Sequence, residues 1–244
     1  MKTFRPLVLS IFIIFAPVHF AQAQSPLGNF LKDLQKTLGI GGLLSSGKIA
    51  DGLKEALEIG TANAIQTVSR VGGYYNNPEI KIPLPAAVQK MEKILRLMGY
   101  GPQVDAFVRS MNQAAEKAAP EAKRIFLDAI KQMTITDARK ILNGPENAAT
   151  LYFKEKTYGA LTGIFKPIVH KSMEKVGVTN RYYQLEQKVA GIPILGTKQF
   201  DLDTYVNDKA LDGLFLMIAE EERRIREDPA ARVTDLLKQV FGKR

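Results

Sequence analysis

The chain has 244 residues, of which 45% are hydrophobic and 24% are charged, and these proportions indicate a folded globular protein rather than a disordered one. It contains no cysteine, which excludes disulfides, a cysteine nucleophile and lipid attachment at an N-terminal cysteine. The formal net charge is +9, but acidic and basic residues alternate along most of the sequence. We therefore expect a solvated surface of mixed sign and no nucleic-acid binding.

The first 23 residues have the layout of a secretory signal peptide. Lys2 and Arg5 precede an apolar run at positions 7–16, and the small-residue sequence Ala-Gln-Ala ends at Ala23. The apolar run is shorter than the ~20 residues that a membrane-spanning helix needs, so we expect cleavage after Ala23 rather than a membrane anchor. The sequence therefore predicts an exported, periplasmic protein.

The residues that follow divide into a short arm and a larger domain. Apolar residues recur at helical spacing over positions 27–38, and a stretch rich in glycine and serine comes next. We expect residues 24–46 to form an amphipathic arm with a flexible linker. Residues 47–244 are then expected to form a single helical domain.

Helical periodicity dominates this domain and predicts an all-α fold. Residues 74–85 are the main exception, because their prolines favour an extended segment. The expected helices lie at about 48–71, 85–98, 103–118, 120–133, 137–143, 146–156, 158–176, 181–189, 202–227 and 234–241. The prediction is a compact multi-helix domain of about nine or ten helices, with at most one minor pair of strands.

Glu222 is the most informative carboxylate in the sequence. It lies four residues after Ile218 and three before Ile225, which places it on the apolar face of its helix. One interpretation is a general acid or a ligand-binding group with a raised pKa. The other is an internal ion pair with a nearby cation such as Arg226, and buried acids are normally paired in this way.

Two further pairs of polar residues share a helix face at i,i+4 spacing. Asn112 and Glu116 stand among alanines, where they could form an internal hydrogen-bond network or the wall of a ligand pocket. Asp208 and Asp212 could bind calcium weakly, but a good calcium site needs at least six oxygen ligands. A solvated or salt-bridged face is the alternative for these two aspartates.

Other catalytic constellations are missing from the sequence. His170 is the only histidine after the signal peptide, so the usual zinc sites cannot be built and a Ser-His-Asp triad would depend on this residue alone. We expect His170 to be exposed and dispensable. No glycine-rich phosphate-binding motif occurs, and we expect neither a cofactor nor a bound metal.

Several long strings, taken together and in this order, resemble an exported bacterial family known as domain of unknown function 4197. They are GLKEALEIGTANAIQTVSRVGGYYNNPEIKIPLP, MNQAAEKAAPEAKRIF, MTITDARKILNG, AATLYFKEKT and YVNDKALDGLFLMIAEEERRIREDPAARVTDLLKQVFG. The resemblance extends from about Gly47 to Gly242. It implies an exported, mostly helical protein of Gram-negative-type bacteria, and it implies no activity and no catalytic residues.

The leading functional hypothesis is a periplasmic, non-enzymatic protein that binds an envelope protein or an apolar small molecule. The alternative is a protein that associates with the membrane surface or with lipid, because the arm at 27–38 is amphipathic and the net charge is positive. A third hypothesis is an enzyme that uses carboxylates, centred on Glu222 or on Asp208 and Asp212.

Overall fold

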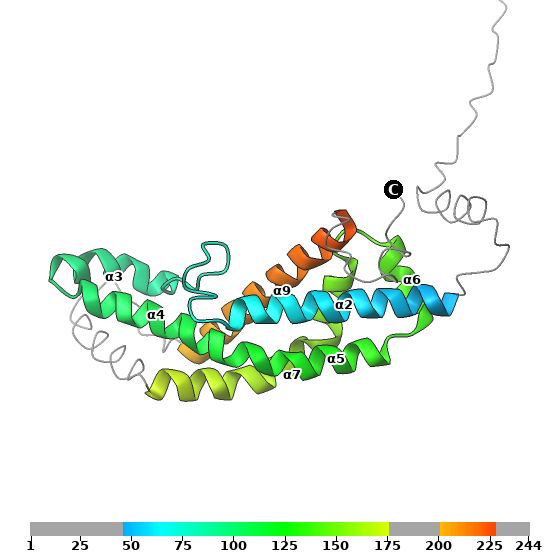
Figure 1. The fold of residues 1–244 in the computed structure, drawn as a ribbon. Coiled ribbons are helices and arrows are strands. Elements are labelled where there is room, and N and C mark those ends of the chain that lie inside the picture. The colour runs from blue at the N-terminus through cyan, green and yellow to red at the C-terminus, as the bar shows by residue number, and fades with distance from the viewer. Residues whose placement is uncertain (1–45, 176–200, 228–244) are drawn as a thin grey trace, which may run out of the picture. The chain divides into compact units, whose positions relative to one another are not determined.

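The computed structural model describes residues 46–175 and 201–227, all within the second of the two units, 1–41 and 42–244, into which the chain divides. The described residues are joined helices with no strand among them, which confirms the all-α class (Figure 1). The helices are α2 (Ser46–Ser69), α3 (Ala86–Leu97), α4 (Gly101–Ala118), the short 3-10 helix η1 (Ala119–Glu121), α5 (Ala122–Gln132), α6 (Ile135–Asn143), α7 (Ala148–Lys175) and α9 (Leu202–Glu227).

The expected number of helices, nine or ten, is too high for the part of the chain that the structure describes. One reason is that α7 continues across position 157, where the sequence analysis placed a break, and runs on through Pro167. The hydroxyl of Thr157 donates to the carbonyl of Phe153, 2.6 Å away in its own helix, so this polar residue is satisfied without a turn. The helices expected at 181–189 and 234–241, and the arm at 27–38, lie outside the described residues.

The described helices pack around one main hydrophobic core. In Figure 1, α4, η1 and α5 follow one another in one direction, and α7 runs back beside them. Helix α9 packs against α7 and α2 and crosses behind α2 in this view. Phe126 of α5 lies edge-on to Phe153 of α7, with ring centroids 5.2 Å apart, and to Phe215 of α9, at 6.0 Å. Helices α5, α7 and α9 thus meet at these rings.

The segment at 74–85, which was expected to be extended, connects α2 to α3. Hydrogen-bonded turns form its first part, as far as Ile80, and only 81–85 is free of turns. Its anchor is Tyr74, which is fully buried and donates its hydroxyl to the carbonyl of Ala210 in α9, 2.7 Å away. Burial is the main reason that the pKa of the Tyr74 phenol is raised above its ordinary value, and the nearby charge of Glu116 adds to the effect. Gly213 of α9 makes room for this ring, because a Cβ there would lie 2.8 Å from Cε1 of Tyr74.

We therefore expect Gly213→Ala to lower the free energy of unfolding by about 1–3 kcal/mol, the usual cost of overpacking a core. The better helix propensity of alanine, worth up to about 1 kcal/mol, should offset only part of this cost. Urea unfolding followed by circular dichroism measures the change. Gly159→Ala is the matched control on α7: no atom lies within 4 Å of its added Cβ, so it should stabilise the protein. Equal effects at both positions would show that the Tyr74 contact does not constrain α9.

Candidate functional site

Glu222 lies at the junction of α6, α7 and α9. Its side chain is 4% exposed, as the sequence pattern predicted. One carboxylate oxygen accepts the backbone N–H of Ala149 at 2.9 Å, and the other accepts the backbone N–H and the hydroxyl of Thr150 at 2.9 and 2.8 Å. Ala149 and Thr150 belong to the first turn of α7, whose N–H groups have no partner inside the helix. Glu222 thus caps α7 from a neighbouring helix.

Arg226 completes this junction from the next turn of α9. Its guanidinium contacts Glu222 through Nε and Nη2, at 3.1 and 2.8 Å. Nη2 also donates to the carbonyl of Ile141, in the last turn of α6, at 3.1 Å. The void beside Glu222 measures only about 10 Å³, which is at the limit for one water molecule. The geometry is that of the internal ion pair, and ligand binding by Glu222 stays a prediction.

Asn112 and Glu116 hold the segment at 74–85 against α4. The Asn112 amide is fully buried; it accepts the N–H of Ile82 at 2.8 Å and donates to the carbonyl of Ile82 at 2.9 Å. Glu116, also buried, accepts the N–H groups of Tyr74 and Tyr75 at 3.2 and 3.4 Å. The predicted internal network is therefore present, and it binds backbone that belongs to no regular helix. A role for either residue in binding a ligand stays a prediction.

Asp208 and Asp212 lie on α9 beside Tyr158 of α7. Burial raises the pKa of the Tyr158 phenol, and the two aspartate charges raise it further. Asp212 pairs with Lys209 at 3.6 Å, and Asp208 accepts a hydrogen bond from Asn207 at 3.1 Å. No three acidic or histidine side chains of the described residues are placed to hold a metal ion. Asp208 and Asp212 are on the same helix as Glu222, but on earlier turns of α9.

His170 is exposed, as predicted, and bridges α7 to α9. Its Nδ1 contacts Asp203, and its Nε2 lies 3.3 Å from Glu174 in its own helix. The hydrogen bond with Asp203 is the main reason that the pKa of His170 is raised above 6.5, and the negative charges of Asp203 and Glu174 also contribute.

This raised pKa predicts a small dependence of stability on pH. The folded state holds the proton more tightly, so the contribution is complete below pH 6.5 and is lost as the pH rises through the raised pKa. Because the pair is exposed, we expect it to contribute less than about 1 kcal/mol. Urea unfolding at a series of pH values from acid to alkaline should show this loss in the wild type and not in His170→Gln. An identical slope in both proteins would contradict the prediction.

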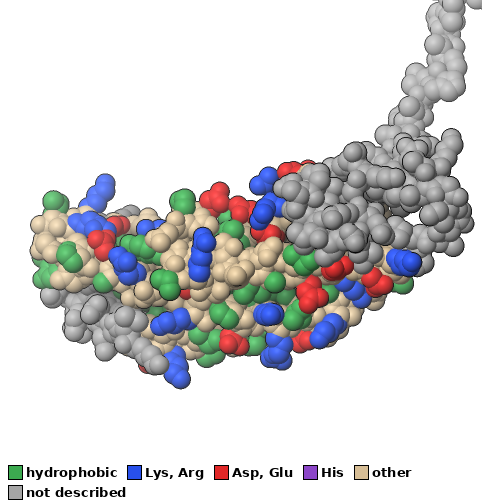
Figure 2. All heavy atoms as spheres, viewed as in Figure 1, with side chains coloured by type: hydrophobic (Ala, Val, Ile, Leu, Met, Phe, Trp, Pro, Cys, Tyr) green, Lys and Arg blue, Asp and Glu red, His purple; other side chains and the backbone are tan. Residues whose placement is uncertain are grey.

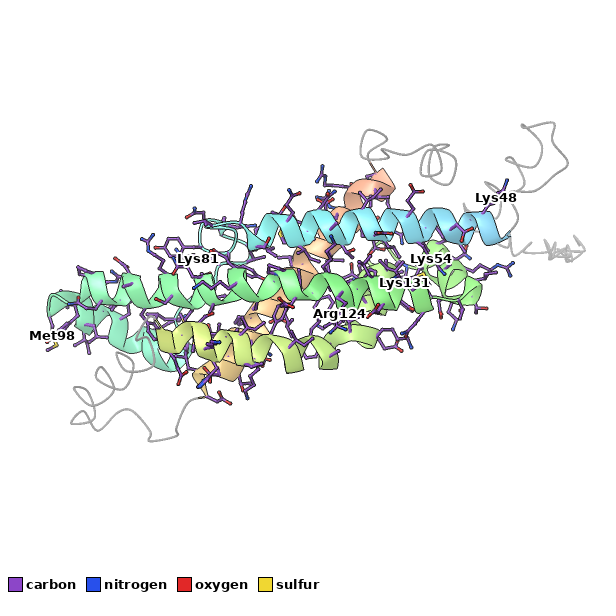
Figure 3. All side chains as sticks on the ribbon, turned by 60° about the horizontal axis from the view of Figure 1, so that its bottom comes forward. Lys48, Lys54, Lys81, Met98, Arg124 and Lys131 are labelled. Atoms are coloured by element: carbon purple, nitrogen blue, oxygen red, sulfur yellow. The ribbon has the colours of Figure 1, made fainter. Side chains whose placement is uncertain are left out.

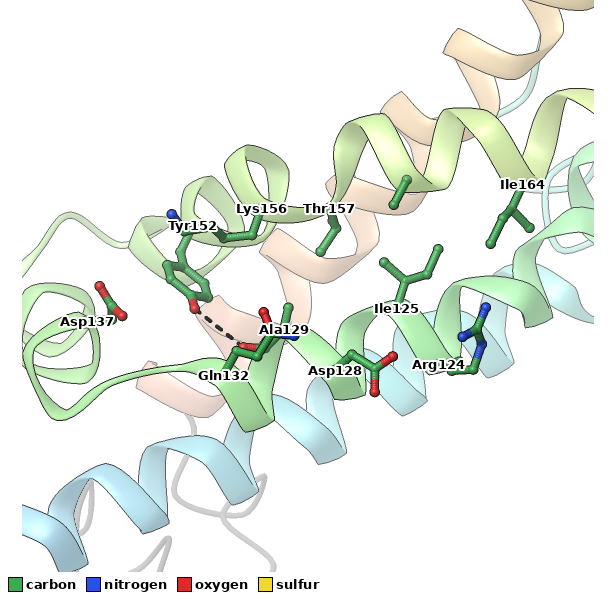
Figure 4. A pocket seen from close by; sticks show the side chains of 11 residues that line it. Arg124, Ile125, Asp128, Ala129, Gln132, Asp137, Tyr152, Lys156, Thr157 and Ile164 are labelled. Atoms are coloured by element: carbon green, nitrogen blue, oxygen red, sulfur yellow. Dashed lines mark hydrogen bonds between the residues drawn. The ribbon is translucent and has the colours of Figure 1, made fainter.

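The sequence analysis missed a groove between α5 and α7, with a volume of about 550 Å³ (Figure 4). Its apolar floor consists of Ile125, Ala129, Ala160 and Ile164. Two of these positions, Ala129 on α5 and Ala160 on α7, carry small side chains. Neither alanine could have been singled out, because an alanine on a helix does not show from the sequence whether it lies in a core, on the surface or beside a cavity.

Polar and charged side chains surround this floor. Tyr152 donates its hydroxyl to the carbonyl of Ala129 at 3.4 Å, across the end of the groove (Figure 4). Burial, followed by the negative charge of Asp137, raises the pKa of the Tyr152 phenol. Arg124, Asp128 and Lys156 complete the rim and are exposed. The rim therefore carries charges of both signs.

The sequence profile of the family described as "Protein of unknown function (DUF4197)" matches residues 43–242, which is most of the chain. The chain belongs to the DUF4197 family. This confirms the resemblance drawn from the sequence strings. No curated protein and no solved structure matches the chain.

The matched region of this DUF4197 chain contains every helix described above, together with the groove and the Glu222 junction. Among the described residues, no helix combines the length and the apolar character needed to cross a membrane. The family description assigns no activity.

Proposed function

We propose that this protein is a periplasmic, non-enzymatic binding protein that accommodates an amphipathic helix of another exported protein between α5 and α7. The groove supports this proposal more than any other feature. It has an apolar floor with an exposed rim of mixed charge, which is the anatomy of a protein interface. Two helices with a channel between them are also a common receptor for a third helix.

The chemistry of the rim favours a polypeptide over a small molecule. Small-molecule sites usually have a few polar groups buried inside the pocket and free to fix the ligand. Here the buried hydroxyl of Thr157 already donates to the carbonyl of Phe153, and Asp137 is bonded to Thr134 at the start of α6. The exposed groups on the rim are Arg124, Asp128 and Lys156. Lys156 pairs with Glu155 at 3.0 Å on the solvent side, and the three charges suit side chains of both signs on an amphipathic helix.

The environment of Glu222, the main carboxylate considered for an enzyme, supports the same proposal. All five hydrogen bonds accepted by Glu222 come from the first turn of α7 and from Arg226. Its oxygens thus satisfy buried backbone donors, and a reacting group would have to displace them. This arrangement favours binding over acid–base catalysis.

The test combines crosslinking with a groove-filling substitution. A photoreactive phenylalanine derivative at the exposed groove residue Gln132, introduced in the native host, should crosslink to an exported protein at an amphipathic segment. A synthetic peptide of that segment should bind the purified protein in calorimetry. Ala160→Trp fills the groove and should weaken this binding at least about tenfold, or about 1.4 kcal/mol.

Ala62→Trp is the matched control, because Ala62 is an exposed alanine on α2 that does not line the groove. It should leave binding unchanged. Equal binding by Ala160→Trp and the wild type, or crosslinking to no defined segment, would overturn the proposal.

The periplasmic location is part of this proposal and has its own prediction. Mass spectrometry of the protein from its native host should find a mature N-terminus at Gln24, because the Ala-Gln-Ala sequence ends at Ala23. Recovery of chains that start at Met1 from the cytoplasm would contradict it.

A further inference from the structure

The hairpin formed by α3 and α4 has a tightly built turn. Gly99 adopts a left-handed conformation, with φ of +84°, and its N–H donates to the carbonyl of Arg96 at 3.1 Å. The N–H of Tyr100 donates to the carbonyl of Leu95 at 2.9 Å. This pair of bonds is the usual way to end a helix at a glycine. The residues at the turn therefore have a fixed position.

The outer side of this turn is apolar and exposed. Leu97 is 88% exposed, Met98 62% and Ile94 42%, whereas Leu95 of the same helix is 1% exposed and anchors α3 in the core. Met98 lies at the extreme end of the hairpin in Figure 3. Clustered exposed apolar side chains of this size mark an interaction site on a folded protein. We call Ile94, Leu97 and Met98 the apolar tip.

Positive charge lies directly behind the apolar tip. Behind the tip, helix α3 carries the cations Lys93 and Arg96 together with the acid Glu92. Arg96 is paired with Glu92 and with Asp105 of α4, at 2.9 and 2.7 Å, while Lys93 is exposed and makes no ion pair with any described residue. Figure 2 shows Lys and Arg side chains next to hydrophobic ones over this end of the hairpin.

We propose that the apolar tip docks at the surface of an anionic phospholipid membrane. Leu97 and Met98 enter the boundary between headgroups and acyl chains, and Lys93 contacts lipid phosphates. In such a membrane the acyl chains lie deepest and the charged headgroups lie above them. Apolar side chains with a lysine behind them match this order, because a lysine can bury its methylene chain while its ammonium group stays among the headgroups. The tip exposes only three apolar side chains, and their surface is far smaller than the ~800 Å² that each partner buries in a stable protein interface. A lipid surface needs no complementary shape.

The absence of tryptophan from the chain provides a direct probe. Met98→Trp places a single tryptophan at the tip. Val71→Trp places one at another apolar residue, which is 94% exposed in the turn after α2. With vesicles of phosphatidylcholine and about one-third phosphatidylglycerol, Met98→Trp should show a blue-shifted emission that brominated lipid quenches. Val71→Trp should show neither effect. The protein is purified from its native host for these measurements.

Vesicle co-sedimentation tests the contribution of each group. Leu97→Glu combined with Met98→Glu should weaken binding at least about tenfold, and Val71→Glu should not change it. Lys93→Gln should weaken binding about fivefold, which corresponds to about 1 kcal/mol per lysine at an anionic surface. Raising the salt concentration should weaken wild-type binding, because it shortens the range of these charges. All substituted positions are exposed, and equal thermal unfolding will show that the variants fold.

Three outcomes would overturn the proposal. One is equal binding by the glutamate double variant and Val71→Glu. Another is equal binding to vesicles of phosphatidylcholine alone. The third is a Met98→Trp emission shift that depends on protein concentration without lipid, accompanied by dimers in sedimentation, because the tip would then contact a second copy of the chain. Ala160→Trp should leave vesicle binding unchanged, so the membrane and groove proposals fail separately.

Discussion

Glu222→Ala is expected to lower the free energy of unfolding by about 3–5 kcal/mol, the cost of stranding a buried charge. The substitution would leave Arg226, whose side chain is 14% exposed, without its carboxylate. It would also leave the N–H groups of Ala149 and Thr150 without the acceptor that caps α7. Because these losses occur at one junction, they should appear in a single cooperative unfolding transition, measured with urea and circular dichroism.

Glu227→Ala is the control for this prediction. Glu227 is on the same helix, is exposed and pairs with Arg223 at 3.2 Å, so its removal should cost less than about 1 kcal/mol. If Glu222→Ala cost no more than Glu227→Ala, the junction would contribute little and Glu222 would be available for another role.

Asn112→Ala is expected to lower the free energy of unfolding by about 2–5 kcal/mol. The substitution leaves both the N–H and the carbonyl of Ile82 without a partner in a buried position, and each unsatisfied group costs about 1–3 kcal/mol. Amide hydrogen exchange should locate the effect, with faster exchange at Ile82 than at Ala149.

Asn143→Ala is the matched control for Asn112. Its side-chain amide makes one hydrogen bond, to the carbonyl of Arg139, at an exposed position. A change within about 0.5 kcal/mol is expected there. A similarly small effect at Asn112 would mean that water replaces its hydrogen bonds, and the segment at 74–85 would then depend on other contacts.

The sequence predicted most of the helical framework because burial leaves a periodic trace. Glu222 could be placed inward from its spacing to Ile218 and Ile225, and both isoleucines are buried. The break expected at position 157 was wrong, because polar residues there also fit a continuous helix when a hydroxyl bonds to its own backbone. Periodicity describes one element at a time, so it does not distinguish one continuous helix from two helices with a break at position 157.

The sequence predicted that the buried polar residues have partners, but it did not predict which distant residues those partners are. Arg226 was a candidate partner of Glu222 because it lies one helical turn away. The N–H groups of Ala149 and Thr150 belong to a segment more than 70 residues earlier, and backbone donors leave no trace in a sequence. The groove was missed for a similar reason, since its space arises from how far apart α5 and α7 lie.

The position of α9 near the end of the chain has a consequence for the order of folding. The backbone groups of Ala149 and Ile141 precede their partners on α9 by 73 and 85 residues, and Tyr74 precedes the carbonyl it binds by 136. Contacts of such long sequence separation slow folding, because long loops must close first. A nascent chain therefore cannot complete this core until α9 has been synthesised. If the chain is exported as we propose, this delay would keep the precursor competent for translocation, and α9 would complete the core of the described helices on the far side of the membrane.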